Sequence, residues 1–320
     1  MVSKAKLALT LGTLIVLSIG WAAPFGAARS FDNGQREQQR VGADTERLSL
    51  ALSPIRFRED PSAGLLVNGW INGAGPFTFA LDTGAGVSII TSRIVSAARL
   101  QVTKSRRPLV GGLTTTPIAS NQQTRATRLA LGTAANAVPA APTLAVVATL
   151  PGMIDGILDP SDLFGGLAYS IDLPNRQLIA FDAKSNGLDL VHPPRDGAIV
   201  RWIKTGGSDR PFVKLGDGRL ALIDTGSSFG LAVNEPASAG RNHINRSVND
   251  LGGGAVQSRE VVPTTVRIGD LMLKSVPTDV LMGVPASTPL LLGRRALYPF
   301  KITFDPTSRL IIFEPTLRSR

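Results

Sequence analysis

The sequence of 320 residues contains no cysteine and only two histidines. The absence of cysteine excludes a cysteine nucleophile, thiolate metal ligands and a lipid-modified cysteine. With two histidines and no thiol, we expect no zinc site and no other metal centre. Neither a phosphate-cradling Gly-Lys-Ser/Thr motif nor a dinucleotide fingerprint occurs, so we expect no cofactor.

Aromatic residues make up only 5% of the chain, and long helical patterns are scarce. Glycine (33) and proline (22) are both abundant, which is typical of many short strands joined by tight turns. With 43% hydrophobic and 18% charged residues, the composition is that of a folded protein. The composition therefore favours an all-β fold.

The N-terminus has the pattern of an export signal. Two lysines precede an apolar run at residues 7–23, and small residues follow at 26–28. We predict that residues 1–28 are a cleaved signal peptide, or alternatively a membrane anchor through residues 7–28, which is just long enough to span a bilayer. Residues 29–47 are polar without a period and are interpreted as a flexible lead-in. We therefore expect a periplasmic or secreted protein, anchored to the membrane if the segment stays uncut.

The net charge of +10 raises the question of a nucleic-acid partner. The arginines are scattered, and neither zinc-finger spacing nor an aromatic RNA-binding motif accompanies them. We interpret the charge as a solvated basic surface and expect no nucleic-acid binding.

The same hairpin pattern occurs twice. Residues 64–71 and 76–81 predict two strands around a glycine-rich turn, and the second strand leads directly into Asp82 of an Asp-Thr-Gly triplet. Residues 211–223 repeat the pattern around an Asp-Gly turn and lead into Asp224 of a second Asp-Thr-Gly triplet.

Each copy continues with four further features in the same order. These are a glycine cluster, a strand-like stretch, an apolar stretch beside a glycine, and a terminal strand pair. In the first copy they lie, in this order, at residues 111–112, 126–132, 156–158 and 170–181. In the second copy they lie at residues 252–254, 264–269, 290–293 and 301–313. The order indicates an internal duplication. We predict two β-rich lobes at residues 48–185 and 195–316, joined by a linker at 186–194.

An Asp-Thr-Gly triplet at a strand end places a carboxylate on a tight turn. Gly84 and Gly226 let backbone amides approach the carboxylates, and the hydroxyl groups of Thr83 and Thr225 can tie the turns to their surroundings. Two carboxylates brought close together share one proton. The ionised member can then take a proton from water while the protonated member hydrogen-bonds a carbonyl oxygen.

The motifs resemble those of the pepsin/retropepsin clan of aspartic peptidases, in a two-lobed bacterial form. Residues 81–85 match the active-site motif of retropepsins, and residues 224–228 match the active-site motif of pepsins. Residues 155–158 and 291–293 resemble the second motif of the clan, two apolar residues and a glycine beneath each active-site turn. The resemblance covers about residues 64–315.

It implies two duplicated pepsin-like β-lobes with an active-site cleft between them. The implied function is an aspartic endopeptidase that acts on protein or peptide substrates with Asp82 and Asp224 as its catalytic pair. An acidic pH preference is expected, because one carboxyl of the pair must stay protonated. We expect a monomer; the substrate and the cleavage preference stay open.

The resemblance also implies roles for the neighbouring residues. Thr83 and Thr225 would hydrogen-bond across the lobes. Ser227 would support the carboxylate of Asp224, whereas Ala85 cannot do the same for the other copy. This predicts that Asp224 is the better-stabilised anion.

Two features depart from the family pattern. Asp159 stands where the first lobe should have the glycine of the second motif, and it would either raise the proton affinity of the pair or point to solvent. The flap expected around residues 107–120 lacks the tyrosine of pepsin-like enzymes, because the only tyrosines are Tyr169 and Tyr298.

Two other functions are compatible with parts of the sequence. A lobe pair that kept the fold and lost activity would be a binding module. Residues 226–230 also match the Gly-x-Ser-x-Gly elbow of a serine hydrolase with Ser228 as nucleophile, a motif that requires a strand-turn-helix setting and a histidine. We expect both His192 and His243 to be solvated instead.

Overall fold

The structure is a computed structural model that describes residues 52–113, 118–139, 142–205, 208–234, 245–249 and 255–316. Residues 46–320 belong to one compact unit, to which all the described residues belong. The predicted signal or anchor at 1–28, the lead-in at 29–47, the glycine cluster at 252–254 and His243 lie outside the described residues. None of the helices within the described ranges is long and apolar enough to cross a membrane.

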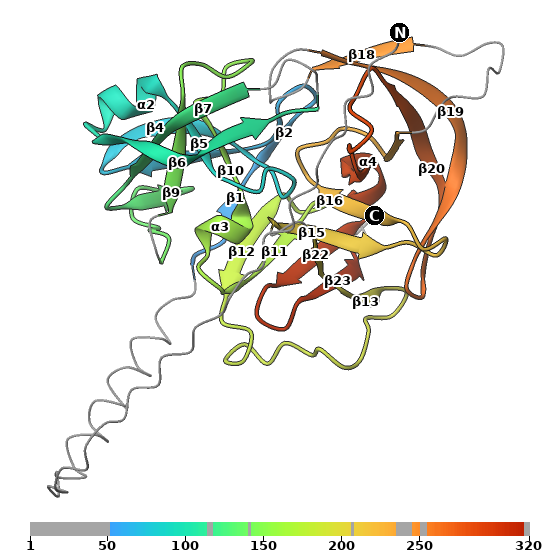
Figure 1. Cartoon of the computed structure of the whole chain (residues 1–320). Helices are drawn as coiled ribbons and strands as arrows, with labels where there is room; N and C mark the ends of the chain where they lie inside the picture. The colour runs from blue at the N-terminus through green and yellow to red at the C-terminus, as the bar shows by residue number, and fades with distance from the viewer. Residues whose placement is uncertain are drawn as a thin grey trace, which may run out of the picture. The chain divides into compact units, whose positions relative to one another are not determined.

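The described chain is mainly β, as the composition predicts. Its strands form three sheets, and its helices are short (Figure 1): α2 at Ser92–Ala97, α3 at Pro160–Leu163 and α4 at Arg294–Leu297.

The N-terminal half forms a nine-stranded sheet in the order β2-β3-β4-β10-β5-β9-β7-β6, with β8 paired to β3. Its strands are β2 (Arg58–Asp60), β3 (Gly64–Ile71), β4 (Ala74–Leu81), β5 (Ile89–Thr91), β6 (Val102–Gly111), β7 (Ile118–Arg125), β8 (Leu129–Leu131), β9 (Thr143–Val147) and β10 (Gly156–Leu158). The hairpin predicted at residues 64–81 is confirmed as β3 and β4.

The C-terminal half forms an eight-stranded sheet in the order β14-β15-β16-β21-β17-β20-β19-β18. Its strands are β14 (Ile203–Thr205), β15 (Ser208–Lys214), β16 (Leu220–Asp224), β17 (Leu231–Val233), β18 (Asn245–Asn249), β19 (Ala255–Ile268), β20 (Leu271–Met282) and β21 (Leu290–Gly293). The second predicted hairpin is β15 and β16.

The pairing directions show that the two sheets are copies of one design. In the first, β10 runs parallel to β4 and antiparallel to β5, and β5 runs parallel to β9. In the second, β21 runs parallel to β16 and antiparallel to β17, and β17 runs parallel to β20. The duplicated pepsin-like fold expected from the sequence is therefore present in both halves.

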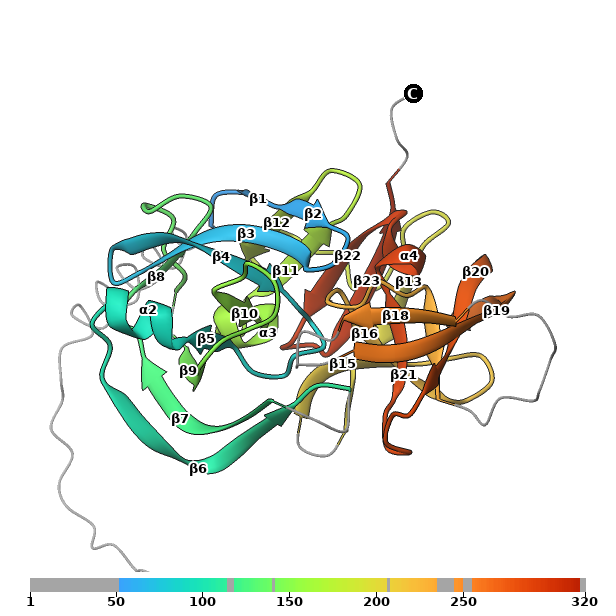
Figure 2. The same ribbon diagram turned by 90° about the horizontal axis from the view of Figure 1, so that it is seen from above.

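A third sheet contains strands from both copies, in the order β1-β12-β11-β22-β23-β13. Its strands are β1 (Ile55–Arg56), β11 (Ala168–Asp172), β12 (Gln177–Phe181), β13 (Ala198–Arg201), β22 (Phe300–Asp305) and β23 (Leu310–Pro315). The pairing of β11 with β22 joins the ends of the two repeats, and Figure 2 shows this sheet lying between the other two.

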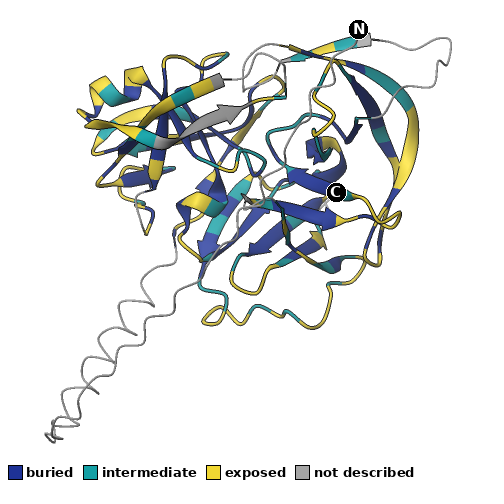
Figure 3. Ribbon diagram, viewed as in Figure 1, coloured by how far each residue is buried: buried dark blue, intermediate teal, exposed yellow. Residues whose placement is uncertain are grey.

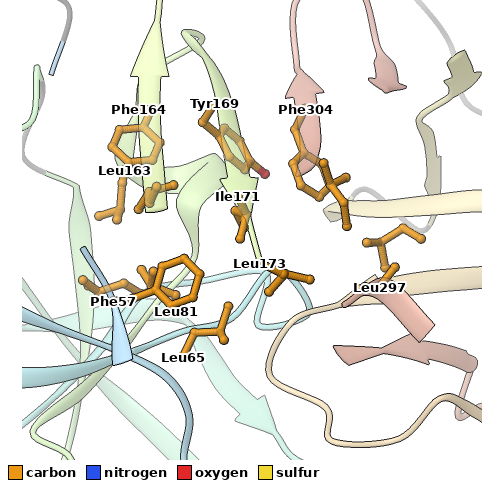
Figure 4. Packing of buried hydrophobic residues seen from close by; sticks show 14 of the residues in the cluster. Phe57, Leu65, Leu81, Leu163, Phe164, Tyr169, Ile171, Leu173, Leu297 and Phe304 are labelled. Carbon is orange, nitrogen blue, oxygen red and sulfur yellow. The ribbon is translucent and has the colours of Figure 1, made fainter. Parts of the chain in front are cut away.

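The core continues through this shared sheet. Tyr169 of β11 stacks on Phe304 of β22 with ring centroids 4.9 Å apart (Figure 4), and Trp202 meets Phe304 edge-on at 6.0 Å. Such aromatic pairs add about 0.5–1.5 kcal/mol beyond their burial. One apolar cluster runs through both halves and a smaller one lies in each half, and Figure 3 shows buried positions on strands of both halves.

Candidate active site

The two Asp-Thr-Gly turns occupy equivalent positions in the two copies. The first follows the last residue of β4, and the second begins with the last residue of β16. In each copy the strand of the second motif lies beside the turn: the N–H of Asp82 donates to the carbonyl of Leu158 at 2.9 Å, and Asp224 pairs with Gly293 in the register of β16 and β21. The repeat therefore puts both carboxylates at the same edge of their sheets.

Thr83 and Thr225 lock the two turns together, and neither exposes any surface. The N–H of Thr83 donates to Oγ1 of Thr225 at 3.2 Å, and the N–H of Thr225 donates to Oγ1 of Thr83 at 3.0 Å. Each hydroxyl donates in turn to a carbonyl of the opposite strand, from Thr83 to Ile223 at 2.7 Å and from Thr225 to Leu81 at 3.2 Å. The predicted hydrogen bonding across the lobes is thus found as a closed set of four bonds.

The glycines of the triplets allow each carboxylate to lie against the backbone of the opposite turn. A Cβ built on Gly84 would lie 2.8 Å from Cγ of Asp224, and one built on Gly226 would lie 2.5 Å from Cγ of Asp82. Any larger residue would collide with the opposite carboxylate, so each turn is shaped around the aspartate of the other. Asp82 and Asp224 are thereby brought together at one place.

The carboxylates differ in their hydrogen bonds. Asp82 accepts from the N–H of Gly84 at 2.7 Å and is further stabilised by the N–H of Gly226 from the other copy. Asp224 accepts from the N–H of Ser227 at 3.0 Å, while the Ser227 hydroxyl accepts from the N–H of Phe229 at 3.3 Å.

The prediction that Asp224 is the better-stabilised anion finds no support in the hydrogen bonds, because each carboxylate accepts one backbone N–H within its own turn. Ser227 supports the carboxylate of Asp224 through its backbone, and its hydroxyl faces another partner. The N–H of Gly226 from the other copy also lowers the pKa of Asp82, since a hydrogen bond to the charged form favours that form. The geometry favours Asp82 as the ionised member.

The surroundings keep a proton on the pair. Burial raises the pKa of Asp82, and the hydrogen bonds to Gly84 oppose this rise. Burial, followed by the negative charge of Asp82, raises the pKa of Asp224 well above its usual range. Both aspartates still keep part of their surface accessible to solvent, so the pair is desolvated by its neighbours but remains open to a reactant.

Arg294 is a site residue that the sequence reasoning missed. Its Nη1 donates to the carbonyls of Thr225 and Gly226, both at 2.9 Å. Its Nε lies 3.5 Å from Oε1 of Glu59 on β2, an ion pair without an aligned hydrogen bond. Its positive charge lowers the pKa of both Asp82 and Asp224, although less than burial raises them. The only signal in the sequence was its position directly after the glycine of the second motif.

Asp159 does not point to solvent, so that alternative is wrong. The residue is only 1% exposed and caps helix α3, accepting from the N–H of Ser161 at 2.8 Å. Burial is the largest cause that raises the pKa of Asp159 to about 7, and the negative charge of Asp82 adds to it.

The expected flap corresponds to the hairpin of β6 and β7, whose tip at residues 114–117 lies outside the described residues. Leu113, just before the tip, packs against an apolar cluster of the C-terminal half that includes Phe229. Tyr169 is in the core and bonds to Ser161, so it is not available to a flap.

The setting of a serine hydrolase elbow is absent around Ser228. The chain after Gly230 continues as strand β17 rather than as a helix. His192 is exposed and its Nδ1 lies 2.9 Å from Asp189. In the ranges that the structure covers, no group of three or more His, Asp or Glu side chains could hold a metal ion.

Residues 67–158 match the family model described as aspartyl protease. The match contains Asp82 and ends one residue before Asp159; Asp224 lies beyond it. A comparison with curated proteins finds no matching relative. The match supports an aspartic peptidase family and points to a protease.

Proposed function

We propose that this protein is an aspartic endopeptidase in which Asp82 and Asp224 hydrolyse peptide bonds through a shared proton. The closed set of threonine hydrogen bonds between the two triplets carries the proposal. A lone Asp-Thr-Gly is a common turn, whereas two triplets whose threonines hydrogen-bond to each other hold two carboxylates together at one place, which supports the proposal.

In the proposed reaction, Asp82 acts as the general base. It takes a proton from a water molecule, whose oxygen forms a bond to the carbonyl carbon of the substrate. Asp224 donates a hydrogen bond to the carbonyl oxygen as negative charge develops there. The tetrahedral intermediate then breaks its C–N bond, and the leaving nitrogen takes up the proton, which gives an amine and a carboxylic acid.

The supporting residues hold this arrangement in place. Thr83, Thr225, Gly84 and Gly226 set the distance between the two carboxyls, and Ser227 donates its N–H to Asp224. Because the pair must hold one proton, hydrolysis is expected to fall both at low pH, where both carboxyls are protonated, and at high pH, where both are ionised.

The proposed substrates are proteins or peptides outside the cytoplasm. This part of the proposal rests on the N-terminal pattern of residues 1–28, which predicts export to the periplasm or beyond, with a membrane anchor if the segment stays uncut.

The proposal is tested by cleavage of unfolded protein substrates across pH, with and without a transition-state-mimicking aspartic peptidase inhibitor. Asp82→Asn and Asp224→Asn keep the side-chain shape and are each expected to lose roughly 10²–10⁴-fold in kcat/KM. Asp189→Asn, which alters an exposed carboxylate beside His192, serves as the control and should retain activity.

Hydrolysis that persists in the double Asp82/Asp224 variant would end the proposal. A wild-type chain that cleaves nothing at any pH and yet binds the inhibitor would favour the alternative, a binding module that kept the fold.

A further inference from the structure

A third carboxyl group lies beside the catalytic pair in the first copy. Leu158 of β10 pairs with Leu81 of β4 in parallel register, so the next residues, Asp159 and Asp82, lie alongside each other. In the second copy the same register pairs Gly293 with Asp224. The two sides of the pair therefore differ by one buried carboxyl.

Asp159 is held in place by hydrogen bonds. Its N–H donates to Oγ of Ser88 at 3.2 Å, and its Oδ1 accepts from the N–H of Ser161 at 2.8 Å. With only 1% of its surface exposed, it can neither swing to solvent nor be screened by it.

The charges that face Asp159 are negative. Asp82 faces it from the turn after β4, and Asp162 from its own helix α3. Tyr169 faces it from β11 and is neutral, because burial raises the pKa of its hydroxyl well above the usual value. Ser88, from the turn before β5, is uncharged.

The opposite side of the pair carries a positive charge. Arg294 occupies the position after Gly293, where the first copy has Pro160 after Asp159. The duplication has thus placed a guanidinium next to one end of the pair and a carboxyl next to the other.

We propose that Asp159 is a positioning residue of the pair, whose ionisation beside Asp82 keeps the shared proton bound up to less acidic pH. The inference rests on the proposed peptidase function. Burial and Asp82 raise the pKa of Asp159 to about 7, so the group is neutral in acid and becomes negative close to neutrality. A new negative charge opposes loss of the last proton from Asp82 and Asp224, which raises the upper pKa of the pair.

The kinetic test compares the full chain with Asp159→Asn and with the control Asp305→Asn. Asparagine keeps the acceptor for Ser161 and cannot ionise. Asp305 is also a 1% exposed carboxyl that accepts a backbone N–H, from Thr307 at 2.9 Å, but it lies in the shared sheet. In Asp159→Asn, the basic limb of the pH profile of kcat/KM is expected to shift to lower pH by about one unit. In Asp305→Asn it is expected to stay in place.

The direct test follows the carboxyl resonances of ¹³C-aspartate protein by NMR and does not require hydrolysis. The resonance absent from Asp159→Asn identifies the group, which is expected to titrate near neutrality in the wild-type chain. In Asp82→Asn its midpoint should fall, because coupling between two titrating groups is reciprocal. If Asp159→Asn does not fold, a carboxyl that titrates near neutrality in the wild-type chain and whose midpoint falls in Asp82→Asn still tests the inference.

Each result decides the inference. A basic limb that stays in place in Asp159→Asn, or moves equally in Asp305→Asn, overturns it. A resonance of Asp159 that titrates at the ordinary value, or is indifferent to Asp82→Asn, overturns it as well. A midpoint that falls in Asp82→Asn, in a chain that hydrolyses nothing, supports the coupling and refutes the peptidase proposal instead.

Discussion

Replacement of Arg294 by methionine separates the contribution of the buried guanidinium from that of an ordinary surface charge. Arg294 has a side chain only 5% exposed, donates to the carbonyls of Thr225 and Gly226, and pairs with Glu59 of the other half. Methionine fills a similar volume without the charge. Arg295, the next residue of helix α4, is exposed and gives the matched control Arg295→Met.

The expected loss follows from what Arg294→Met leaves behind. The carbonyls of Thr225 and Gly226 lose a charged donor, and the exposed Glu59 loses its ion pair. Hydrogen bonds from a charged donor are worth about 1.5–3 kcal/mol each, so the loss of both is expected to lower the free energy of unfolding by about 3–5 kcal/mol. A surface change such as Arg295→Met is expected to stay within about 0.5 kcal/mol.

Urea unfolding of both variants, followed by circular dichroism, measures this difference. A loss of about 3–5 kcal/mol corresponds to a midpoint shift on the order of 1–2 M urea. Arg294 also lowers the pKa of both Asp82 and Asp224, so its removal should move both limbs of the pH profile to higher pH. Equal midpoints for the two variants, or an unmoved pH profile in Arg294→Met, would refute the role given to the guanidinium.

Three further predictions concern the turns and their neighbour. Thr83→Val should lower the free energy of unfolding by about 2–4 kcal/mol in urea titrations, because it leaves buried polar groups of the opposite turn unpaired, and Thr83→Ser should restore most of this loss. Gly226→Ala places a Cβ 2.5 Å from Cγ of Asp82 and is expected to reduce kcat/KM at least ~10²-fold in the cleavage assay, since displacement of a catalytic group by about 1 Å is sufficient. Asp159, with its pKa raised to about 7, binds more protons folded than unfolded, so it makes the chain lose stability as pH rises from about 4 to 7. Asp159→Asn should flatten this decline by about 4 kcal/mol, as measured by urea unfolding at a series of pH values; an identical slope in wild type would contradict the assignment.

The repeated motifs made much of the fold predictable. The glycine-rich turn and the Asp-Gly turn predicted the strand pair before each triplet. The order of the later features predicted a duplication that the strand pairings confirm. The resemblance to the aspartic peptidase clan implied that Thr83 and Thr225 would hydrogen-bond across the lobes, and they do. Features that occur in both copies can therefore be recognised in a single sequence.

The contacts that no motif repeats were not predictable. The shared sheet depends on Tyr169 meeting Phe304 across 135 positions of chain, and nothing local to either strand specifies that pairing. Ser227 was expected to support Asp224, and it does so through its backbone N–H, while its hydroxyl accepts from the N–H of Phe229; the sequence does not distinguish these two roles. Arg294 acts through carbonyls of a distant turn, and such acceptors leave no trace in side-chain patterns.

The departure at Asp159 is compensated in the turn above it. In the second copy, a Cβ at Gly293 would lie 2.5 Å from the carbonyl oxygen of Phe229, and the Gly293 N–H donates to the carbonyl of Gly230. In the first copy the residue equivalent to Gly230 is Ser88, whose hydroxyl accepts the N–H of Asp159 in place of that carbonyl. Ser88 thus supplies a side-chain acceptor at the position where the second copy supplies a backbone carbonyl. Because Ser88 and Ser161 both bond to Asp159, the carboxyl beside Asp82 is held as part of the site rather than left without partners.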